Sequence, residues 1–292
     1  MTEDQPSSPV EVQPQLAPPP STILERFGIP PVLFAFGTLI LLFFLYQIIG
    51  GLTTVLIFGL KPTEENITGY RLSTGVGQLL LLFVPTLLLL QCISRTPAAF
   101  VRLRRPDLRT LFVPIVGIFS LQQMLQIYLV FQDRIPVPPE LEHQLEELRR
   151  LIDEATRLLV GSTTVPELLW VVVIIAVIPA VAEELLFRGL VLRSLQTAMS
   201  PMRAVIVTGI LFGGYHLNPA SFVPLSAIGI YLGFLALRAD SLWVSMSAHF
   251  VNNVIATVAL YVRMSDDFVV TGNAEQMSNG MLLLTFWLFG VV

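Results

Sequence analysis

Long apolar runs separated by short polar segments dominate the chain, and they set the first expectation for its fold. A helix needs about 20 mainly apolar residues to cross a hydrocarbon core of about 30 Å. Runs of this kind occupy approximately residues 31–58, 73–93, 111–131, 165–192, 203–217, 222–237 and 241–263, with a last one from Met281 to Val292. Those at 203–217 and 222–237 are short for a span, and the last is shorter still. The pattern predicts an all-α polytopic membrane protein with about seven to eight transmembrane helices.

The polar segments divide the chain further. Residues 1–28 are rich in proline, so we expect a disordered N-terminal tail before the transmembrane helices of 29–131. Within 132–164, apolar residues recur at spacings of three and four, which predicts an extramembrane amphipathic helix. The residues of this apolar stripe are Leu141, Leu145, Leu148, Ile152, Ala155 and Leu159. A second group of helices is expected over 165–263, and a loop with a short C-terminal apolar helix over 264–292.

The composition agrees with a protein whose main surroundings are the lipid bilayer. Hydrophobic residues make up 54% of the chain and charged residues 13%, about half the charged share of an average soluble domain. The net charge of -4 is spread thinly, without the basic block of a nucleic-acid binder, so we expect no nucleic-acid partner. Cys92 is the only cysteine, which excludes an internal disulfide and a cysteine-based zinc site.

The distribution of arginines predicts the orientation. Five of them gather between the second and third apolar runs: Arg95, Arg102, Arg104, Arg105 and Arg109. Loops rich in basic residues favour the cytoplasm, so this loop and the N-terminus are expected there, with the acidic segment around 138–159 on the opposite side. Lys61 is the only lysine beside many arginines. This bias is typical of a GC-rich bacterial genome, so we expect a location in a bacterial cytoplasmic membrane.

Two adjacent glutamates interrupt the fourth apolar run. In the stretch PAVAEELLFRGLV, Glu183 and Glu184 are followed by Arg188. Glu184 and Arg188 are four residues apart, so they share a helix face and can neutralise each other. Glu183 points about 100° away and needs a proton, a cation or a hydrogen-bonding partner. Ionisable residues in membrane helices usually mark functional sites, although a buried ion pair that only fixes packing is the alternative at this point.

Two histidines lie inside later apolar runs. Phe212 precedes His216 by one helical turn, and Asn253 follows His249 by one turn. With a rise of about 1.5 Å per residue, both histidines and Glu183 can meet at one level inside the bundle. That level lies nearer to the arginine-rich side, so we expect water and substrate to reach it from the cytosol.

Together these residues form three motifs in order: EExxxR at Glu183, Glu184 and Arg188, FxxxH at Phe212 and His216, and HxxxN at His249 and Asn253. In order and spacing they resemble the CAAX prenyl protease type II family of intramembrane glutamic endopeptidases, also called the Abi or CPBP family. The resemblance covers about residues 165–263. It implies a catalytic domain there, with the active site inside the helix bundle.

The resemblance also implies a role for each motif residue. Glu183 and His216 would activate a water that attacks a peptide carbonyl, with Glu183 as general base. His249 and Asn253 would donate hydrogen bonds to the developing oxyanion. The remaining motif residues, Glu184, Arg188 and Phe212, would support the site. The expected partner is a peptide or membrane-protein substrate, and no cofactor is implied.

Two alternatives stay open. Glu183, His216 and His249 match the ligand count of a catalytic zinc site, although the chain has no HExxH motif, so a zinc-dependent membrane metalloprotease is one alternative. The other is a proton-coupled transporter or a membrane scaffold in which Glu183 and His216 form a relay. Transporters often contain paired repeats, and we see no internal duplication here. The identity of the substrate does not follow from the sequence.

Overall fold

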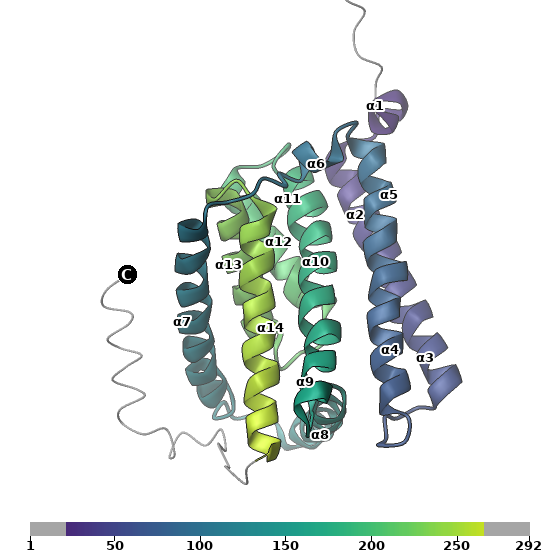
Figure 1. Ribbon diagram of the computed structural model, residues 1–292, viewed down its shortest axis with the longest axis vertical. Coiled ribbons are helices and arrows are strands. Elements are labelled where there is room, and N and C mark those ends of the chain that lie inside the picture. The colour runs from purple at the N-terminus through teal and green to yellow at the C-terminus, as the bar shows by residue number, and fades with distance from the viewer. Residues whose placement is uncertain (1–21, 266–292) are drawn as a thin grey trace, which may run out of the picture.

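The protein is a bundle of helices, and the computed structural model describes its residues 22–265 (Figure 1). Five helical segments in this range are long and apolar enough to cross a membrane: Pro31–Phe58, Ile67–Ile93, Leu108–Gln132, Val165–Leu195 and Leu242–Val262. Two shorter apolar helices are Pro201–Tyr215 and Phe222–Arg238. The prediction of an all-α polytopic membrane protein is confirmed. Of the about seven to eight transmembrane helices expected, five within residues 22–265 are long enough to span and two are shorter, and the apolar run from Met281 to Val292 lies outside the described residues.

Three of the long segments combine several helices. The first joins α2 (Pro31–Phe43) to α3 (Gly51–Phe58), the second joins α4 (Ile67–Gly77) to α5 (Val84–Ile93), and the fourth joins α9 (Val165–Val172), α10 (Ile178–Glu184) and α11 (Leu192–Leu195). The third and the last are the continuous helices α7 (Leu108–Gln132) and α14 (Leu242–Ser265).

π-Helical turns connect the helices within each combined segment. They cover Phe44–Gly50, Gln78–Phe83, Val173–Val177 and Leu185–Val191. A π turn widens the helix locally and is frequent at functional sites. The turn at Leu185–Val191 begins directly after the two adjacent glutamates and contains Arg188.

The two short helices form a hairpin that does not reach across the bundle. α12 (Pro201–Tyr215) and α13 (Phe222–Arg238) are about 22 and 25 Å long, whereas the 31 residues of Val165–Leu195 extend about 46 Å. Both helices meet the surface at the same end, so their connection at 217–221 lies within the depth of the bundle (Figure 1). They pack closely: a Cβ atom on Gly213 would lie 2.8 Å from the carbonyl oxygen of Phe222.

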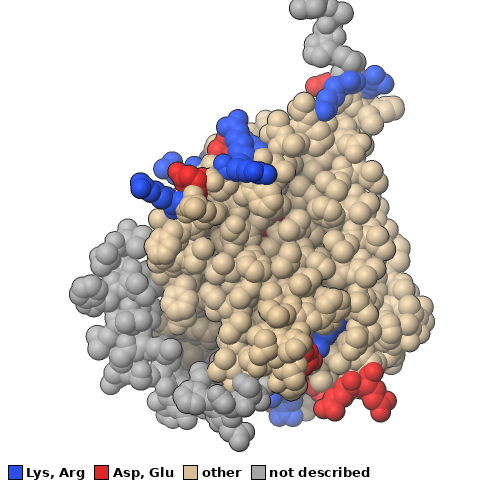
Figure 2. All heavy atoms as spheres, viewed as in Figure 1, with Lys and Arg blue, Asp and Glu red and all other residues tan. Residues whose placement is uncertain are grey.

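Arginines mark the end of the bundle at which this hairpin begins, at the top of Figures 1 and 2. The short helix α6 (Pro97–Phe100) leads into a loop in which Arg102 and Arg104 form ion pairs with Asp240. Asp107 caps α7, and hydrogen bonds from the hydroxyl and the backbone N–H of Thr110 lower the pKa of the Asp107 carboxyl. Between the two charged ends the visible surface is almost entirely uncharged, as expected for a face in contact with lipid (Figure 2).

The amphipathic helix predicted within 132–164 is α8 (Pro139–Val160), at the opposite end of the bundle (Figure 1). The buried side chain of Arg71 fastens its C-terminus. The guanidinium donates to the carbonyl oxygens of Leu158 and Leu159, at 2.9 Å each, and pairs with Glu167 at 2.7 Å. A cation at the last carbonyls of a helix also interacts favourably with the helix dipole.

One predicted boundary needs correction. We expected a disordered tail through residue 28, but Ile23–Phe27 forms the short helix α1. The Thr22 hydroxyl accepts from the N–H of Glu25, and the Glu25 carboxylate accepts from the N–H of Thr22, so the helix begins with a capping box. Residues 1–21, the rest of that tail, lie outside the described range.

Candidate active site

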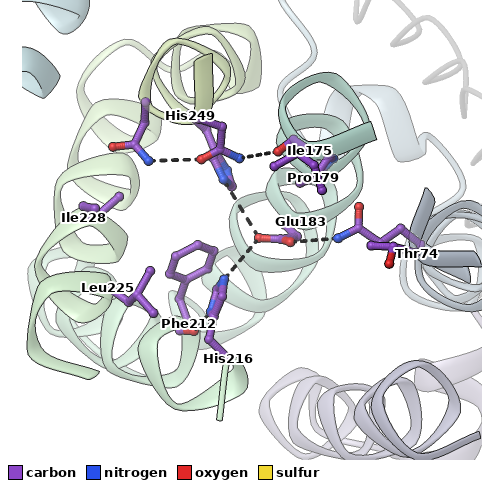
Figure 3. Close-up of a pocket in the computed structure, with 12 residues that line it drawn as sticks. Thr74, Ile175, Pro179, Glu183, Phe212, His216, Leu225, Ile228 and His249 are labelled. Carbon is purple, nitrogen blue, oxygen red and sulfur yellow. Dashed lines mark hydrogen bonds and ion pairs between the residues drawn. The ribbon is translucent and has the colours of Figure 1, made fainter. Parts of the chain in front are cut away.

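All four side chains predicted to be catalytic meet around one cavity of about 220 Å³ (Figure 3). Glu183 comes from α10, His216 follows the last residue of α12, and His249 and Asn253 project from α14. Phe212 also lines the cavity. The other lining residues are Thr74, Gln78, Ile175, Pro179, Leu225, Ile228 and Asn252.

Glu183 occupies the centre of this group, and its side chain is 13% exposed. One carboxylate oxygen, Oε1, accepts a hydrogen bond of 3.2 Å from Nε2 of Gln78. The other, Oε2, is buried and has no hydrogen-bond partner within the described part of the chain. It lies 3.9 Å from Nε2 of His216 and 4.0 Å from Nε2 of His249. Figure 3 shows both rings directed at this oxygen. A buried acceptor of this kind needs a donor, and residues 22–265 do not supply one.

The hydrogen bonds of the two rings decide which nitrogen carries a proton. Nδ1 of His216 lies 2.8 Å from the carbonyl oxygen of Phe212, which can only accept, so this nitrogen is protonated. Nδ1 of His249 lies 2.9 Å from Oε1 of Glu184. The Glu184 carboxylate is paired with Arg188 and is therefore ionised, so it can only accept a hydrogen bond from Nδ1. In a neutral ring the second nitrogen is then an acceptor. Three acceptors therefore face one point of the cavity: Oε2 of Glu183 and Nε2 of both histidines.

Glu184 and Arg188 form the ion pair that the sequence predicts. Both side chains are fully buried, and Nη1 of Arg188 lies 2.6 Å from Oε1 of Glu184. Nη2 of the same guanidinium donates to the carbonyl oxygen of Gly229 on α13 at 2.7 Å. The pair thus joins the fourth segment to the hairpin. Its contact with His249 was not predicted, because helix periodicity says nothing about a side chain 65 residues away.

Phe212 packs between the ion pair and the histidines. Its ring centre lies 4.7 Å from the guanidinium carbon of Arg188, 4.7 Å from the ring of His216 and 5.8 Å from that of His249. A cation near an aromatic face and edge-on contacts between rings are both favourable. The side chain is 1% exposed, so it separates the buried ion pair from the cavity and restricts the positions of both rings.

Asn253 is held by a chain of amides. Its Nδ2 donates to the carbonyl oxygen of Ile175 at 3.0 Å, and its Oδ1 accepts from Nδ2 of Asn252 at 3.1 Å. The side chain of Gln122 on α7 in turn donates to Oδ1 of Asn252 at 2.9 Å. An amide nitrogen has two hydrogens, so Asn253 retains one N–H group beyond its bond to Ile175.

Two residues of this network were missed in the sequence. Gln78 and Gln122 both come from helices before residue 165 and hold Glu183 and Asn252, respectively. The available signal was a glutamine inside a long apolar run, since buried polar groups in membrane helices need a partner. That signal alone does not identify the partner.

The lining of the cavity is relevant to the access that we expected from the arginine-rich side. Along α10 and α14, the lining residues beyond Glu183 and His249 lie toward the other end of the bundle. Pro179 precedes Glu183 by one turn in the direction of α9, and Asn253 follows His249 by one turn in the direction of the end of α14. The helical rise per residue predicted correctly that Glu183 and the two histidines lie at one level. It gives no information on which side of that level the bundle leaves space.

The spacing of the three acceptors allows a test of the zinc alternative. Tetrahedral ligands at about 2.0–2.1 Å from zinc lie about 3.4 Å apart, whereas Oε2 of Glu183 is 3.9 and 4.0 Å from the two imidazole nitrogens. Among residues 22–265, no group of three or more His, Cys, Asp or Glu side chains is arranged to hold a metal ion. The three groups have the chemistry of zinc ligands, at separations wider than those of a tetrahedral site.

A carboxylate, two histidines and an amide around a cavity inside membrane helices are polar groups of the kind that usually marks a functional site in a membrane protein. Comparison with known families shows which membrane proteins the chain is similar to. Residues 165–255 match the family model described as type II CAAX prenyl endopeptidase Rce1-like. This similarity suggests a membrane protease. The match covers α9 to most of α14, with all three motifs. No curated protein and no solved structure matches the chain.

Proposed function

We propose that the protein is an intramembrane endopeptidase of the bacterial branch of this family, which hydrolyses a peptide bond with an activated water. One observation carries the proposal: the unpartnered oxygen Oε2 of Glu183 faces Nε2 of both His216 and His249. A single water can bridge groups about 4 Å apart while it makes a normal hydrogen bond to each. Water would thus occupy the position where three acceptors converge.

Glu183 is the general base in this mechanism. The water donates one hydrogen to Oε2 of Glu183 and the other to Nε2 of His216. As the water oxygen attacks the peptide carbonyl carbon, Glu183 takes the proton. The bond from Gln78 to Oε1 leaves Oε2 as the oxygen directed at the water. No serine or cysteine nucleophile is required.

The oxyanion that forms in this step needs donors. Asn253 offers its second N–H, and the amide chain from Asn252 holds it in place. His249 can donate from Nε2 only when both of its nitrogens carry a proton, and the Glu184 carboxylate 2.9 Å from Nδ1 holds the ring in position. Donors placed in advance around a developing charge are usually a large part of catalysis.

Collapse of the tetrahedral intermediate completes the reaction. The carbon–nitrogen bond breaks, and the proton held by Glu183 passes to the leaving amine. The products are a new carboxylic acid and a new amine, and water is the only other reactant. Glu183 then returns to the carboxylate form.

Cleavage of a fluorogenic peptide library by the detergent-purified protein tests the proposal. The library contains prenylated and unprenylated peptides, because the family description mentions prenyl substrates and a bacterial location predicts unprenylated ones. Wild type is compared with Glu183→Gln, which keeps the size of the side chain but removes the base. Glu146→Gln, at an exposed position of α8, is the matched control.

Each outcome separates the alternatives. Cleavage by wild type and Glu146→Gln in the presence of a zinc chelator, with none by Glu183→Gln, supports the metal-free mechanism. Activity that the chelator abolishes and added zinc restores assigns the reaction to a metalloprotease. If no peptide of the library is cleaved, a transporter or scaffold accounts better for the buried polar residues.

A further inference from the structure

Along the fourth segment and α14, the lining of the cavity extends from Glu183 and His249 toward one end of the bundle. Along the fourth segment, Pro179 lines the cavity one turn before Glu183, and along α14, Asn253 lines it one turn after His249. Thr74 extends the lining along α4. α4 and α14 both contact α8, and α9 follows α8 directly in the chain. The cavity therefore runs from Glu183 toward the end that holds α8.

In the other direction the bundle is filled. One turn after Glu183, the side chain of Phe187 is completely buried, and so is that of Leu190 in the following turn. One turn before His249, Ser245 is completely buried and Met246 is 7% exposed. Phe187, Leu190 and Met246 belong to one continuous apolar core with residues of the first and second segments. A polar substrate cannot approach Glu183 through this core without displacing it.

The short hairpin explains why space is left on the α8 side. Its connection at 217–221 follows His216 directly and lies within the depth of the bundle. Pro219 and Ala220 of this connection line a second cavity together with Leu145 and Leu148 of α8. Gln132 at the end of α7 donates to the carbonyl oxygen of Ala220 at 2.9 Å. α8 thus lies under the hairpin, at the end toward which the active-site cavity runs.

Charge assigns the two ends to the two sides of the membrane. The arginine-rich end carries Arg95, Arg102, Arg104, Arg105 and Arg109 within 15 residues of sequence. Such a cluster beside a span favours the cytoplasm. The α8 end carries acidic side chains together with its basic ones (Figure 2). These acidic residues include Glu64, Glu65, Asp133, Glu140, Glu142, Glu146, Glu147, Asp153 and Glu154.

From the direction of the cavity and from this charge distribution, we infer that the active site is reached from the extracytoplasmic side, past α8. The inference rests on the proposed peptidase function. Its substrates are extended polypeptide segments on that side of the membrane, such as the segment just outside the span of a membrane-anchored protein. A helix is about 10–12 Å in diameter, too wide for a cavity of about 220 Å³, so the segment must be unwound.

Cysteine labelling in whole cells tests the direction of access without requiring activity. The full chain is expressed with Cys92→Ser, which removes the only native thiol. Single cysteines are then introduced as Thr74→Cys in the cavity, as His143→Cys on α8 and as Ser200→Cys before α12; the last two positions are exposed. Thr74→Cys nearly preserves the size of the side chain. A small membrane-impermeant thiol reagent is added to intact spheroplasts and to inverted vesicles.

The expected result is modification of Thr74→Cys and His143→Cys in intact spheroplasts and of Ser200→Cys only in inverted vesicles. A Thr74→Cys protein that reacts together with Ser200→Cys, or on neither side, overturns the inference. Reaction of His143→Cys only in inverted vesicles also overturns it, because the α8 end would then be cytoplasmic. Since labelling does not depend on catalysis, an inactive protein still gives this result, and failure of the peptidase function remains distinguishable.

Discussion

Nδ1 of His249 lies 2.9 Å from the same Glu184 oxygen that binds Arg188 at 2.6 Å. This contact links the first and third sequence motifs through one buried carboxylate. It determines that Nδ1 carries the proton and that Nε2 faces the cavity. Glu184 therefore does more than neutralise Arg188. It also fixes the orientation of the His249 ring.

Replacement of Glu184 by glutamine is expected to reduce both activity and stability. Arg188 would remain buried beside a neutral amide, and loss of one partner of a buried ion pair costs about 3–5 kcal/mol. Activity should fall further than folding alone explains, because His249 loses its charged acceptor. Thermal unfolding and peptide cleavage by the folded fraction of Glu184→Gln measure the two effects. Unchanged specific activity of that fraction contradicts a role in orienting His249.

Gly213 is expected to tolerate no side chain. A Cβ atom there would lie 2.8 Å from both the backbone nitrogen of Ser226 and the carbonyl oxygen of Phe222, and neither can move without a shift of α13. Overpacking of this kind costs about 1–3 kcal/mol, so Gly213→Ala should lower the midpoint of thermal unfolding. The neighbouring Gly214→Ala is the control, because its Cβ would meet only the Phe222 ring at 3.9 Å. Equal midpoints for the two variants contradict the expected close packing.

Sequence reasoning predicted the helices and the motif residues, because both depend on local spacing. Apolar runs of sufficient length become membrane helices, and Glu184 and Arg188 pair since they are one turn apart. Contacts between distant segments could not be predicted. The bond from Gln78 to Glu183 depends on how the second and fourth segments pack. The direction of the cavity depends on the depth at which the α12–α13 hairpin turns, and that depth follows from tertiary packing.

Asn253→Ala tests the oxyanion role most directly. If Asn253 donates its second N–H to the developing oxyanion, its removal should lower kcat by about 10²–10³-fold with little change in KM. A proton-coupled transporter should keep most of its activity in this variant, because an amide does not carry protons. The matched control is Asn218→Ala, since Asn218 is an asparagine of the α12–α13 connection that does not line the cavity. A kcat within a few-fold of wild type would assign oxyanion stabilisation to other groups.

Gln78→Leu examines a residue outside the segment that matches the family. The change removes the hydrogen bond to Oε1 of Glu183, and a bond to a charged group contributes about 1.5–3 kcal/mol. Without it the carboxylate can rotate, so kcat should fall about 10- to 100-fold. Gln47→Leu is the control, because Gln47 is also a membrane glutamine with one long-range bond, 3.1 Å to the carbonyl oxygen of Tyr215. If both variants lose activity equally, the effect is one of general packing. A selective loss in Gln78→Leu shows that the second segment helps to position the base, so the N-terminal helices take part in forming the site.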